Sequence, residues 1–375
     1  MDQALKLLED LRADPERAYS CYRKIAHLDF TPEQREKANY ELGIICYYLG
    51  KMKEGHDALN DNILSWPYLA AGRKEGGELA WQSLSNLYWY LKPIPVAKWT
   101  SISIQGPPGY NCLNPSIIPW KGGYLANVRQ ANYTVIEGDY HSNSPDGIIR
   151  NVNYLCYYTE ELQLTSVRPL PTIPIDYPVN AYGLEDIRLY YDRGEVIFTC
   201  NSRNNHPHVI PRVSFGRITS FEPPQIEVTH QPSPDRSNKC EKNWLFIRKD
   251  TYLYDPFSIM RKGRIVKTAP RVADLRCSAG PIRYRQGLLF LTHQVIFRGN
   301  ERAYLHRFCH WGKTSYLISD PFIFHHRGLE YAIGLTWHKG NLLLGLGLRD
   351  REAWWAEIER TVVDSLLDEG KCIPL

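Results

Sequence analysis

Residues 185–202 read EDIRLYYDRGEVIFTCNS, and this stretch has the pattern of a β-hairpin. Two runs rich in β-branched and aromatic residues, IRLYY and EVIFTC, flank the polar turn DRG. Two carboxylates, Glu185 and Asp186, come directly before the first run, and Arg188 lies within it. We expect the core side chains of this hairpin to be Tyr190, Val196 and Phe198. A strand buried in the core does not explain these charged residues. A polar motif recurs at the same position, ahead of the turn, in other hairpins of the chain.

Four further hairpins share this design. Each has a short polar motif, a strand of six to eight residues, a turn made of Lys, Asp, Arg or Gly, and a second strand. The five polar motifs stand at nearly the same offset ahead of their turns: Asn114-Pro115-Ser116, Glu185-Asp186, Lys242-Asn243, Gly280-Pro281 and Glu330-Tyr331. A radial arrangement would bring these positions together near one axis, whereas a sandwich would not. Units of about 50 residues then predict a five-bladed β-propeller.

The predicted fold class is mainly β, with the propeller preceded by a small all-α domain. Residues 1–95 have helical periodicity, and Pro93 and Pro95 mark the boundary. Short strand-like runs follow until REAWWAEIERTVVDSLLDE at residues 351–369, which has the periodicity of a helix. The predicted domains are therefore a helical domain at residues 1–95 and a propeller domain at residues 96–375 that ends in a helix.

The helical region contains one segment similar to a tetratricopeptide repeat. Thr31 and Pro32 form a cap and a first-turn proline ahead of a predicted helix. The small and apolar positions of the repeat match Leu42-Gly43, Gly50, Gly55, Leu59 and Pro67. The match covers one repeat, whereas about three are needed for a free-standing solenoid. Two interpretations follow: a helical cap on the next domain, or a module for a protein partner or self-association.

The composition excludes several classes of protein. The chain has 375 residues and a net charge of +4, too small for a nucleic-acid-binding protein. Its nine cysteines are scattered without a C-x-x-C pair, which favours reduced thiols. The acidic, amphipathic N-terminus is not that of a signal peptide, and no apolar run reaches the roughly 20 residues of a membrane span. These features predict a cytoplasmic protein without a membrane span.

The polar residues that the propeller would gather near its axis suit a sugar phosphate or another polyol. Carboxylates and amides form hydrogen bonds with hydroxyl groups, and Arg and Lys bind phosphate. The high aromatic content of 12% is favourable both for a β core and for stacking on sugar rings. The predicted site residues are Asn114, Ser116, Arg129, Glu185, Asp186, Arg188, Lys242, Asn243, Arg283, His293, Glu330, Tyr331 and Asp350.

No cofactor and no metal are predicted. The chain lacks a P-loop, the dinucleotide fingerprint G-x-G-x-x-G, the nucleophile motif G-x-S-x-G and the zinc motif H-E-x-x-H. The two histidine pairs, His206 with His208 and His325 with His326, lack a convincing third ligand.

The motif GLEDIR at residues 183–188 resembles the G-x-E-D-P-R motif of glycoside hydrolase family 130. That family comprises five-bladed propellers that act as β-mannoside phosphorylases and hydrolases, and the related glycosyltransferase family 108 contains mannosyltransferases and phosphorylases. Further segments resemble the family's motifs in the right order over about residues 98–360: NPSIIPWKGGYLANVR, EKNWLF, SAGPIRYRQGLLFLTHQV and LEYAIGL followed by LLLGLGLRD. Each motif alone is short, and the ordered set carries the resemblance.

The resemblance implies roles for individual residues. Asp186 would be the general acid/base, Asn114 would bind the sugar, and Glu185 and Arg188 would hold and tune the carboxylate. The groups that would hold the donor's phosphate are Arg129, Lys242, Asn243 and Arg283. Repulsion from Glu185 would raise the pKa of Asp186 and Arg188 would lower it, so the sequence leaves the direction open.

The implied function is hexosyl transfer, with mannosyl the expected group, by a glycosyltransferase or glycoside phosphorylase acting on a donor and a glycan acceptor. Ile187 in place of the family's Pro, Gln294 in place of its Gly, and YDPF after EKNW depart from the family's pattern. These departures leave a nucleotide-sugar or sugar phosphate donor at least as favoured as free phosphate. One alternative is an inverting hydrolase with Glu330 or Asp350 as the second carboxylate. The other is a non-catalytic carbohydrate-binding scaffold.

Overall fold

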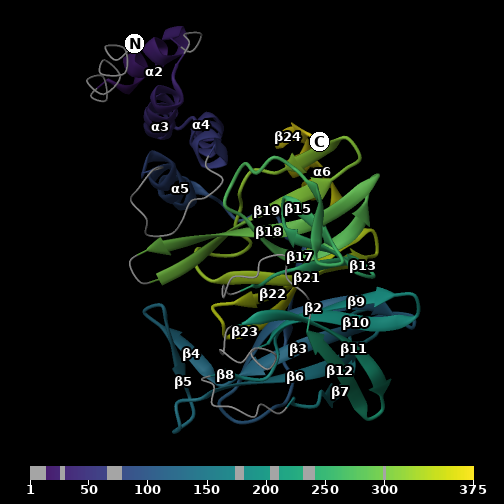
Figure 1. Ribbon diagram of the computed structural model, residues 1–375. Helices are drawn as coiled ribbons and strands as arrows, with labels where there is room; N and C mark the ends of the chain where they lie inside the picture. Colours follow the sequence, from purple (N-terminus) through teal and green to yellow (C-terminus); the bar gives the residue numbers. More distant parts are fainter. Residues whose placement is uncertain are drawn as a thin grey trace. The chain divides into compact units, whose positions relative to one another are not determined.

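The computed structural model describes residues 14–25, 30–65, 78–173, 181–202, 211–230, 241–298 and 301–375. The chain divides into two units: Met1–Lys92 with Arg271–Asp274, and Pro93–Pro270 with Leu275–Leu375. The first unit contains helices and the second is dominated by strands (Figure 1). The predicted mainly β fold with a five-bladed β-propeller and an N-terminal helical region is confirmed.

Within the described residues, five antiparallel sheets form the blades of the propeller. Blade 1 consists of β2 (Asn111–Trp120), β3 (Gly123–Ala131), β6 (Ile149–Tyr158) and β7 (Leu164–Pro169). Blade 2 consists of β9 (Glu185–Asp192), β10 (Glu195–Ser202), β11 (Arg212–Phe221) and β12 (Pro224–His230). Blade 3 consists of β13 (Leu245–Arg248), β14 (Thr251–Asp255), β15 (Ser258–Arg261) and β16 (Arg264–Thr268).

Blades 4 and 5 complete the ring. Blade 4 consists of β17 (Arg276–Tyr284), β18 (Gly287–Arg298), β19 (Glu301–Trp311), β20 (Ser315–Ile318) and β24 (Lys371–Pro374). Blade 5 consists of β21 (Glu330–His338), β22 (Asn341–Leu348), β23 (Glu352–Ile358) and β1 (Lys98–Ile102). Strand β8 (Ala181–Tyr182) pairs with β6 in parallel, and β4 (Tyr133–Ile136) with β5 (Asp139–Ser142) forms a separate hairpin.

Strand β1 closes the ring by joining the last blade. It pairs antiparallel with β23, so that Thr100 lies opposite Trp355. The innermost strands β2, β9, β13, β17 and β21 contact one another in order, and β21 in turn contacts β2. The five polar motifs lie in or just before these inner strands, so that closure of the ring places them around one axis.

Apolar side chains between neighbouring blades form the core. Phe198 and Ile187 of blade 2 pack with Leu125 of blade 1, and all three are fully buried. Burial of a side chain of this size contributes about 1.5–3 kcal/mol to stability. Val196 is buried with them as predicted, whereas Tyr190 is partly exposed and packs on the ring of Phe246 at 5.4 Å.

The polar motifs coincide with left-handed backbone in four of the blades. Asn114, Asp186 and Asn243 have φ angles of 42°, 53° and 68°, and Gly280 has a φ of 96°. Asn, Asp and Gly are the residues that adopt this conformation at the lowest cost. In blades 1, 2 and 4 the strand register shifts beside the motif, which indicates a bulge. The constant offset seen in the sequence therefore has a backbone cause.

The helices of the first unit are α2 (Pro15–Ile25), α3 (Pro32–Tyr48), α4 (Met52–Ser65) and α5 (Glu78–Tyr90). Thr31 caps α3 with the predicted geometry, because its hydroxyl accepts from the Gln34 N–H while the Gln34 side chain accepts from the Thr31 N–H. A methyl group at Gly43 would lie 2.5 Å from the Leu59 side chain of α4, so a small residue is required there. The assignment of a tetratricopeptide repeat stays a prediction.

The C-terminal helix is shorter than the sequence pattern predicts. Residues 352–358 form strand β23, and only α6 (Arg360–Asp368) is helical. The prediction of one helix over 351–369 was therefore wrong in its first half. AWWAEI pairs with β22 on one side and β1 on the other, and burial of Trp355 in the blade outweighs local helical periodicity.

Candidate active site

A cavity of about 560 Å³ lies where inner-strand residues of the blades meet. Its walls come from residues in or beside the inner strands of blades 1 to 5 and from the β4–β5 and β18–β19 hairpins. The lining residues are Asn114, Arg129, Tyr133, Tyr140, Gly147, Ile149, Asn151, Ala181, Glu185, Asp186, Lys242, Asn243, Arg276, His293, Arg302, Tyr304, Tyr331 and Asp350.

Nine of the thirteen residues predicted from the sequence line this cavity together. They are Asn114, Arg129, Glu185, Asp186, Lys242, Asn243, His293, Tyr331 and Asp350. The other four, which also belong to the described part of the chain, lie elsewhere. Most of the polar motifs therefore meet near the axis, but not every side chain within these motifs reaches the cavity.

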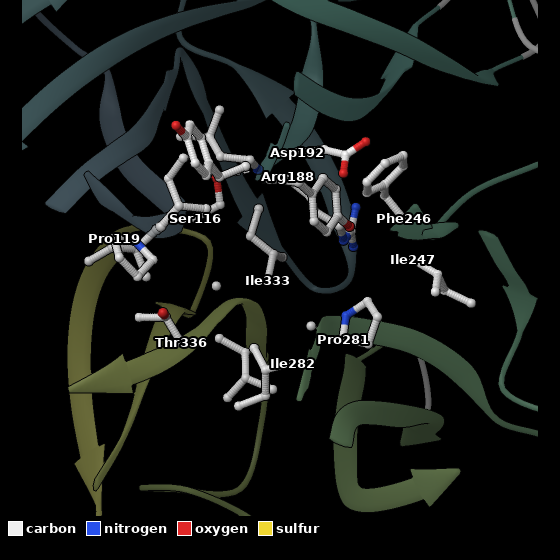
Figure 2. A pocket seen from close by; sticks show the side chains of 18 residues that line it. Ser116, Pro119, Arg188, Asp192, Phe246, Ile247, Pro281, Ile282, Ile333 and Thr336 are labelled. Carbon is white, nitrogen blue, oxygen red and sulfur yellow. Dashed lines mark hydrogen bonds between the residues drawn. The ribbon is translucent and has the colours of Figure 1, made fainter. Parts of the chain in front are cut away.

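Ser116 and Arg188 line a second cavity of about 220 Å³, which Figure 2 shows from close by. Its walls are mainly apolar and include Phe246, Ile282 and Ile333. The Ser116 hydroxyl accepts a hydrogen bond from the Leu189 N–H at 3.3 Å, so that it links blades 1 and 2. The predicted placement of these two side chains on the main cavity is corrected.

Arg283 is exposed and does not line either cavity. It lies near the end of β17 that leads into the turn, where its carbonyl accepts from the Trp337 indole N–H at 3.1 Å. Arg276, at the opposite end of the same strand, lines the main cavity instead. The prediction that Arg283 lies in the phosphate site is therefore wrong. Strand β17 spans the full depth of the blade, and Arg283 lies at the end of the strand that does not reach the cavity.

Glu330 is fully buried and faces away from the main cavity. Its carboxylate accepts hydrogen bonds from the backbone N–H groups of Phe324, His325 and His326, each at 2.7 Å. Burial raises the pKa of Glu330 to about 7, while these three bonds act to lower it. Glu330 therefore holds the segment before β21, and its predicted role as a second carboxylate in the site is corrected.

Asp186 is held from three other strands. Its Oδ1 accepts from Asn114 Nδ2 at 3.0 Å and lies 3.4 Å from Arg129 Nη2. Its Oδ2 accepts from Asn201 Nδ2 at 3.4 Å. These partners lie on β2, β3 and β10, so the position of the carboxylate depends on blades 1 and 2 together.

The charges around Asp186 settle the direction of its pKa. Burial acts to raise the pKa, but the charges of Arg129, Arg188 and Lys242, with the Asn114 hydrogen bond, hold it below its usual value. Glu185 does not reverse this effect, since its carboxylate lies 3.6 Å from the Lys242 ammonium group. The carboxylate is consequently ionised at neutral pH.

Arg188 joins four blades beneath Asp186. Its Nη1 donates to the Asp186 carbonyl at 3.1 Å, and its Nε donates to the Ser278 carbonyl at 2.8 Å. Its Nη2 donates to the Asn243 side-chain oxygen at 3.1 Å and to the Tyr331 hydroxyl at 2.7 Å. The Tyr331 hydroxyl donates in turn to Asn243 at 2.8 Å. Arg188 thus holds the backbone of Asp186 and does not contact its carboxylate oxygens with a hydrogen bond.

A second carboxylate, Asp350, lines the same cavity. Burial raises its pKa, with the charge of Asp186 adding to the increase and Arg129 opposing it. The Arg129 charge lowers the pKa of both carboxylates, yet the pKa of Asp186 is lowered overall and that of Asp350 is raised.

His293 lies within the wall as a neutral imidazole. Burial, with repulsion from nearby cations such as Arg276, lowers its pKa well below the usual value. Its ring meets that of Tyr331 edge-on at 5.2 Å and lies 5.1 Å from that of Tyr304. Among the described residues its Nδ1 is buried without a hydrogen-bond partner.

Comparison with known proteins bears on the fold. No protein-family model and no curated protein matches this chain. A β-1,2-mannobiose phosphorylase from Listeria innocua, solved with β-1,2-mannobiose, matches with a TM-score of 0.51 and 11% identity over 71% of this chain and 95% of that one. The likeness is one of fold. A putative glycoside hydrolase from Parabacteroides distasonis has a TM-score of 0.48 and 14% identity over 72% of this chain and 97% of that one. A mannose phosphorylase from Leishmania mexicana, solved with phosphate, has a TM-score of 0.45 and 14% identity over 78% of this chain and 95% of that one.

Six polar or aromatic lining residues were not predicted from the sequence. They are Tyr133, Tyr140, Asn151, Arg276, Arg302 and Tyr304. Most of them lie outside the inner strands, on the β4–β5 hairpin and on β6 and β19. The available signal was the tyrosine-rich hairpin pattern YTVIEGDYHS at residues 133–142, which lacks the polar motif that the five inner-strand hairpins share.

The remaining predictions concern metals and membranes. His206 and His208 lie outside the described residues. Across the described ranges, no group of three His, Cys, Asp or Glu residues has an arrangement that could hold a metal ion. Nor does any helix in those ranges combine the length and apolar character needed to cross a membrane.

Gly347 of β22 is expected to be essential for the position of Asn114. A methyl group at this residue would lie 2.2 Å from the Asn114 side-chain oxygen, so Gly347→Ala must displace the amide that holds Asp186. We expect a loss of about 1–3 kcal/mol in the free energy of unfolding, as for other overpacked sites, together with reduced turnover. Denaturant unfolding and a turnover assay measure the two effects. Gly340→Ala is the control for turnover only: its methyl group enters open space in the β21–β22 turn and should leave turnover intact, while the left-handed backbone at this residue (φ 87°) makes the substitution costly for stability.

Proposed function

We propose that the propeller is a carbohydrate-active enzyme that transfers a hexosyl group, with mannosyl the first candidate, between a phosphate-activated donor and a glycan acceptor. The observation that carries the proposal is the ionised Asp186 in one cavity with Arg129, Lys242 and Arg276. An acid/base group beside several cations suits chemistry in which a phosphate group leaves or attacks. The Listeria innocua phosphorylase with the same fold is the reason to begin with mannose donors.

In the synthetic direction, the ionised Asp186 would accept the proton of the acceptor hydroxyl. The acceptor oxygen then bonds to the anomeric carbon as the bond from that carbon to the donor's phosphate oxygen breaks, and the electron pair leaves with the phosphate. Arg129, Lys242 and Arg276 would stabilise the negative charge that develops on it. Asn114, which already contacts Asp186, would orient the sugar.

The reverse direction requires Asp186 to be protonated so that it can donate to the glycosidic oxygen. A phosphate dianion bound to the same cations would offset their charge and raise the pKa of Asp186. Binding of phosphate to these cations would therefore favour the protonated form of Asp186 that phosphorolysis requires.

Lys242→Met is expected to move the acid limb of synthesis activity to higher pH. Lys242 is one of the cations that lower the pKa of Asp186, so its loss raises that pKa. A base works only when it is ionised. As the pH is lowered, the activity of the variant should therefore begin to fall at a higher pH than the activity of the parent protein. The measurement is kcat/KM for acceptor against pH at saturating donor. Lys339→Met, at the exposed β21–β22 turn, should reproduce the parent profile, and coincident profiles for Lys242→Met would contradict the assignment.

A hydrolase is the second candidate, and the presence of Asp350 in the same cavity favours it. An inverting glycosidase uses a second carboxylate about 6.5–9.5 Å from the acid to activate water. The two enzymes differ in their need for phosphate: a hydrolase cleaves a mannoside in phosphate-free buffer, whereas a phosphorylase requires phosphate. Asp350→Asn would abolish hydrolysis but would not remove the group proposed to accept the acceptor's proton.

The decisive experiment is a donor panel. The protein is incubated with GDP-mannose or mannose 1-phosphate and with mannose or β-1,2-mannobiose as acceptor, and release of GDP or phosphate is followed. Release that depends on the acceptor supports the proposed transfer. Absence of release from every donor, with no cleavage of mannosides, would overturn the enzymatic proposal and leave a carbohydrate-binding scaffold.

A further inference from the structure

One wall of the main cavity is aromatic and is built by two hairpins outside the inner strands. We call Tyr133, Tyr140 and Tyr304 the aromatic wall. Tyr133 and Tyr140 lie on the β4–β5 hairpin, and Tyr304 lies on β19. Figure 1 shows both hairpins on the same side of the propeller, and a hydrogen bond from Arg302 Nη1 to the Tyr140 hydroxyl at 3.3 Å joins them.

The rings of the aromatic wall are held before any ligand binds. The Tyr140 ring meets that of Tyr133 at 5.1 Å and an interplanar angle of 67°, while its hydroxyl is bound by Arg302. The Tyr304 ring is held by contacts with His293 at 5.1 Å and Tyr331 at 5.8 Å. A ring fixed on more than one side loses little conformational entropy when a ligand packs on it.

Tyr140 differs from its neighbours in exposure. It is 45% exposed, whereas Tyr133 is 6% exposed. An exposed aromatic ring on the wall of a polar cavity offers an apolar face that a flat ligand can cover while its polar edge contacts Arg and carboxylate groups. A pyranose ring has this combination of an apolar face and polar edges.

The cavity is therefore divided by chemistry. Arg129 and Lys242, with Asp186 between blades 1 to 3, form a charged part that suits the phosphate-bearing donor. The aromatic wall, contributed by the β4–β5 hairpin and by the β18–β19 hairpin of blade 4, forms a part with no carboxylate of its own. Asp350 interacts with both parts of the cavity. The hydroxyl of Tyr133, in the aromatic wall, and the charge of Arg129, in the charged part, both lower its pKa.

We propose that Tyr140 and Tyr304, braced by Arg302, form the acceptor subsite, where the pyranose ring whose hydroxyl receives the hexosyl group stacks on Tyr140. This proposal rests on the proposed function, and it names the half of the site that selects the acceptor. Tyr140 contacts the acceptor, and Arg302 is a positioning residue that fixes the Tyr140 ring. The occupant is a hexopyranose at the end of a glycan.

The test compares acceptor and donor kinetics in variants of Tyr140. Tyr140→Ala is expected to raise the acceptor KM by about fivefold to tenfold, the effect of losing one aromatic contact, with the donor KM unchanged. Tyr140→Phe keeps the ring but loses the hydroxyl that Arg302 binds, so it is expected to raise the acceptor KM less than Tyr140→Ala does and to leave the donor KM within about twofold of the parent protein. Arg302→Met releases the ring and should raise the acceptor KM less than Tyr140→Ala does.

The matched control is Tyr191→Ala, because Tyr191 is an exposed strand tyrosine that lies outside the main cavity. Calorimetric titration of methyl β-mannoside into Tyr140→Ala and the parent protein gives a readout independent of turnover. An unchanged acceptor KM with unchanged titration would overturn the proposal while transfer itself continues. A rise in donor KM alone would assign the wall to the nucleotide or phosphate donor and would also overturn it. If the parent protein turns over no donor, the proposed function fails, and the titration alone then decides whether Tyr140 binds a pyranose.

Discussion

Asp186→Asn is expected to reduce turnover by about 100-fold to 10,000-fold, the contribution typical of a general acid/base, while the protein keeps its fold. Asn is nearly isosteric with Asp and tolerates the left-handed backbone found at this position. Its side-chain oxygen can still accept from Asn114, so the local hydrogen bond is retained. The substitution therefore removes the charge and the proton-accepting ability, together with the 3.4 Å hydrogen bond from Asn201.

The measurement is single-turnover kinetics with saturating donor and acceptor, accompanied by a thermal unfolding curve. Asp192→Asn is the matched control, since Asp192 ends the same strand and lies outside the main cavity. It should leave turnover unchanged. Sugar binding that persists in Asp186→Asn would separate loss of chemistry from loss of the site, whereas parental turnover in that variant would show that another group moves the proton.

Arg188→Met is expected to have the largest effect on stability. The variant leaves the carbonyls of Asp186 and Ser278 and the side chains of Asn243 and Tyr331 without their shared donor. Each buried polar group left unsatisfied costs about 1–3 kcal/mol, so we expect the free energy of unfolding to fall by at least about 3 kcal/mol. Denaturant unfolding of the full chain measures this change.

Loss of Arg188 should also raise the pKa of Asp186, because one of its neighbouring cations is removed. Arg188→Lys separates the two effects. It keeps a positive charge, so the pH profile of turnover should stay near that of the parent protein, but an ammonium group cannot reproduce the four bonds of the guanidinium fork. Arg217→Met, on the exposed face of β11, is the control for removal of an arginine and should change neither quantity. Parental stability in Arg188→Met would contradict the bridging role.

The fold was predictable because its repeated feature is local. Asn114, Asp186 and Asn243 stand at one offset in the sequence because the inner strands of blades 1 to 3 need a left-handed residue at one place, and Asn and Asp supply it. Closure by β1 and the strand character of AWWAEI were not predicted, since both depend on pairing between residues about 250 positions apart.

The site was predictable only as far as the inner strands extend. Tyr331 enters the cavity while its neighbour Glu330 faces the opposite way, because successive side chains of a strand alternate between its two faces. Arg276 and Arg283 lie near opposite ends of strand β17, and only the end that carries Arg276 reaches the cavity.

The repeated hairpin and the propeller were predictable because both follow from short motifs of residues close together in the chain. The choice of Asp186 as the catalytic carboxylate came from the resemblance of GLEDIR to a family motif and stays a prediction. Tertiary structure decided the rest. It brought Tyr140 of the β4–β5 hairpin into contact with Arg302 of blade 4, and it placed Arg129, Arg188 and Lys242 around Asp186 so that its pKa falls. A pKa depends on distances between charges and on burial, and only the folded chain sets those quantities.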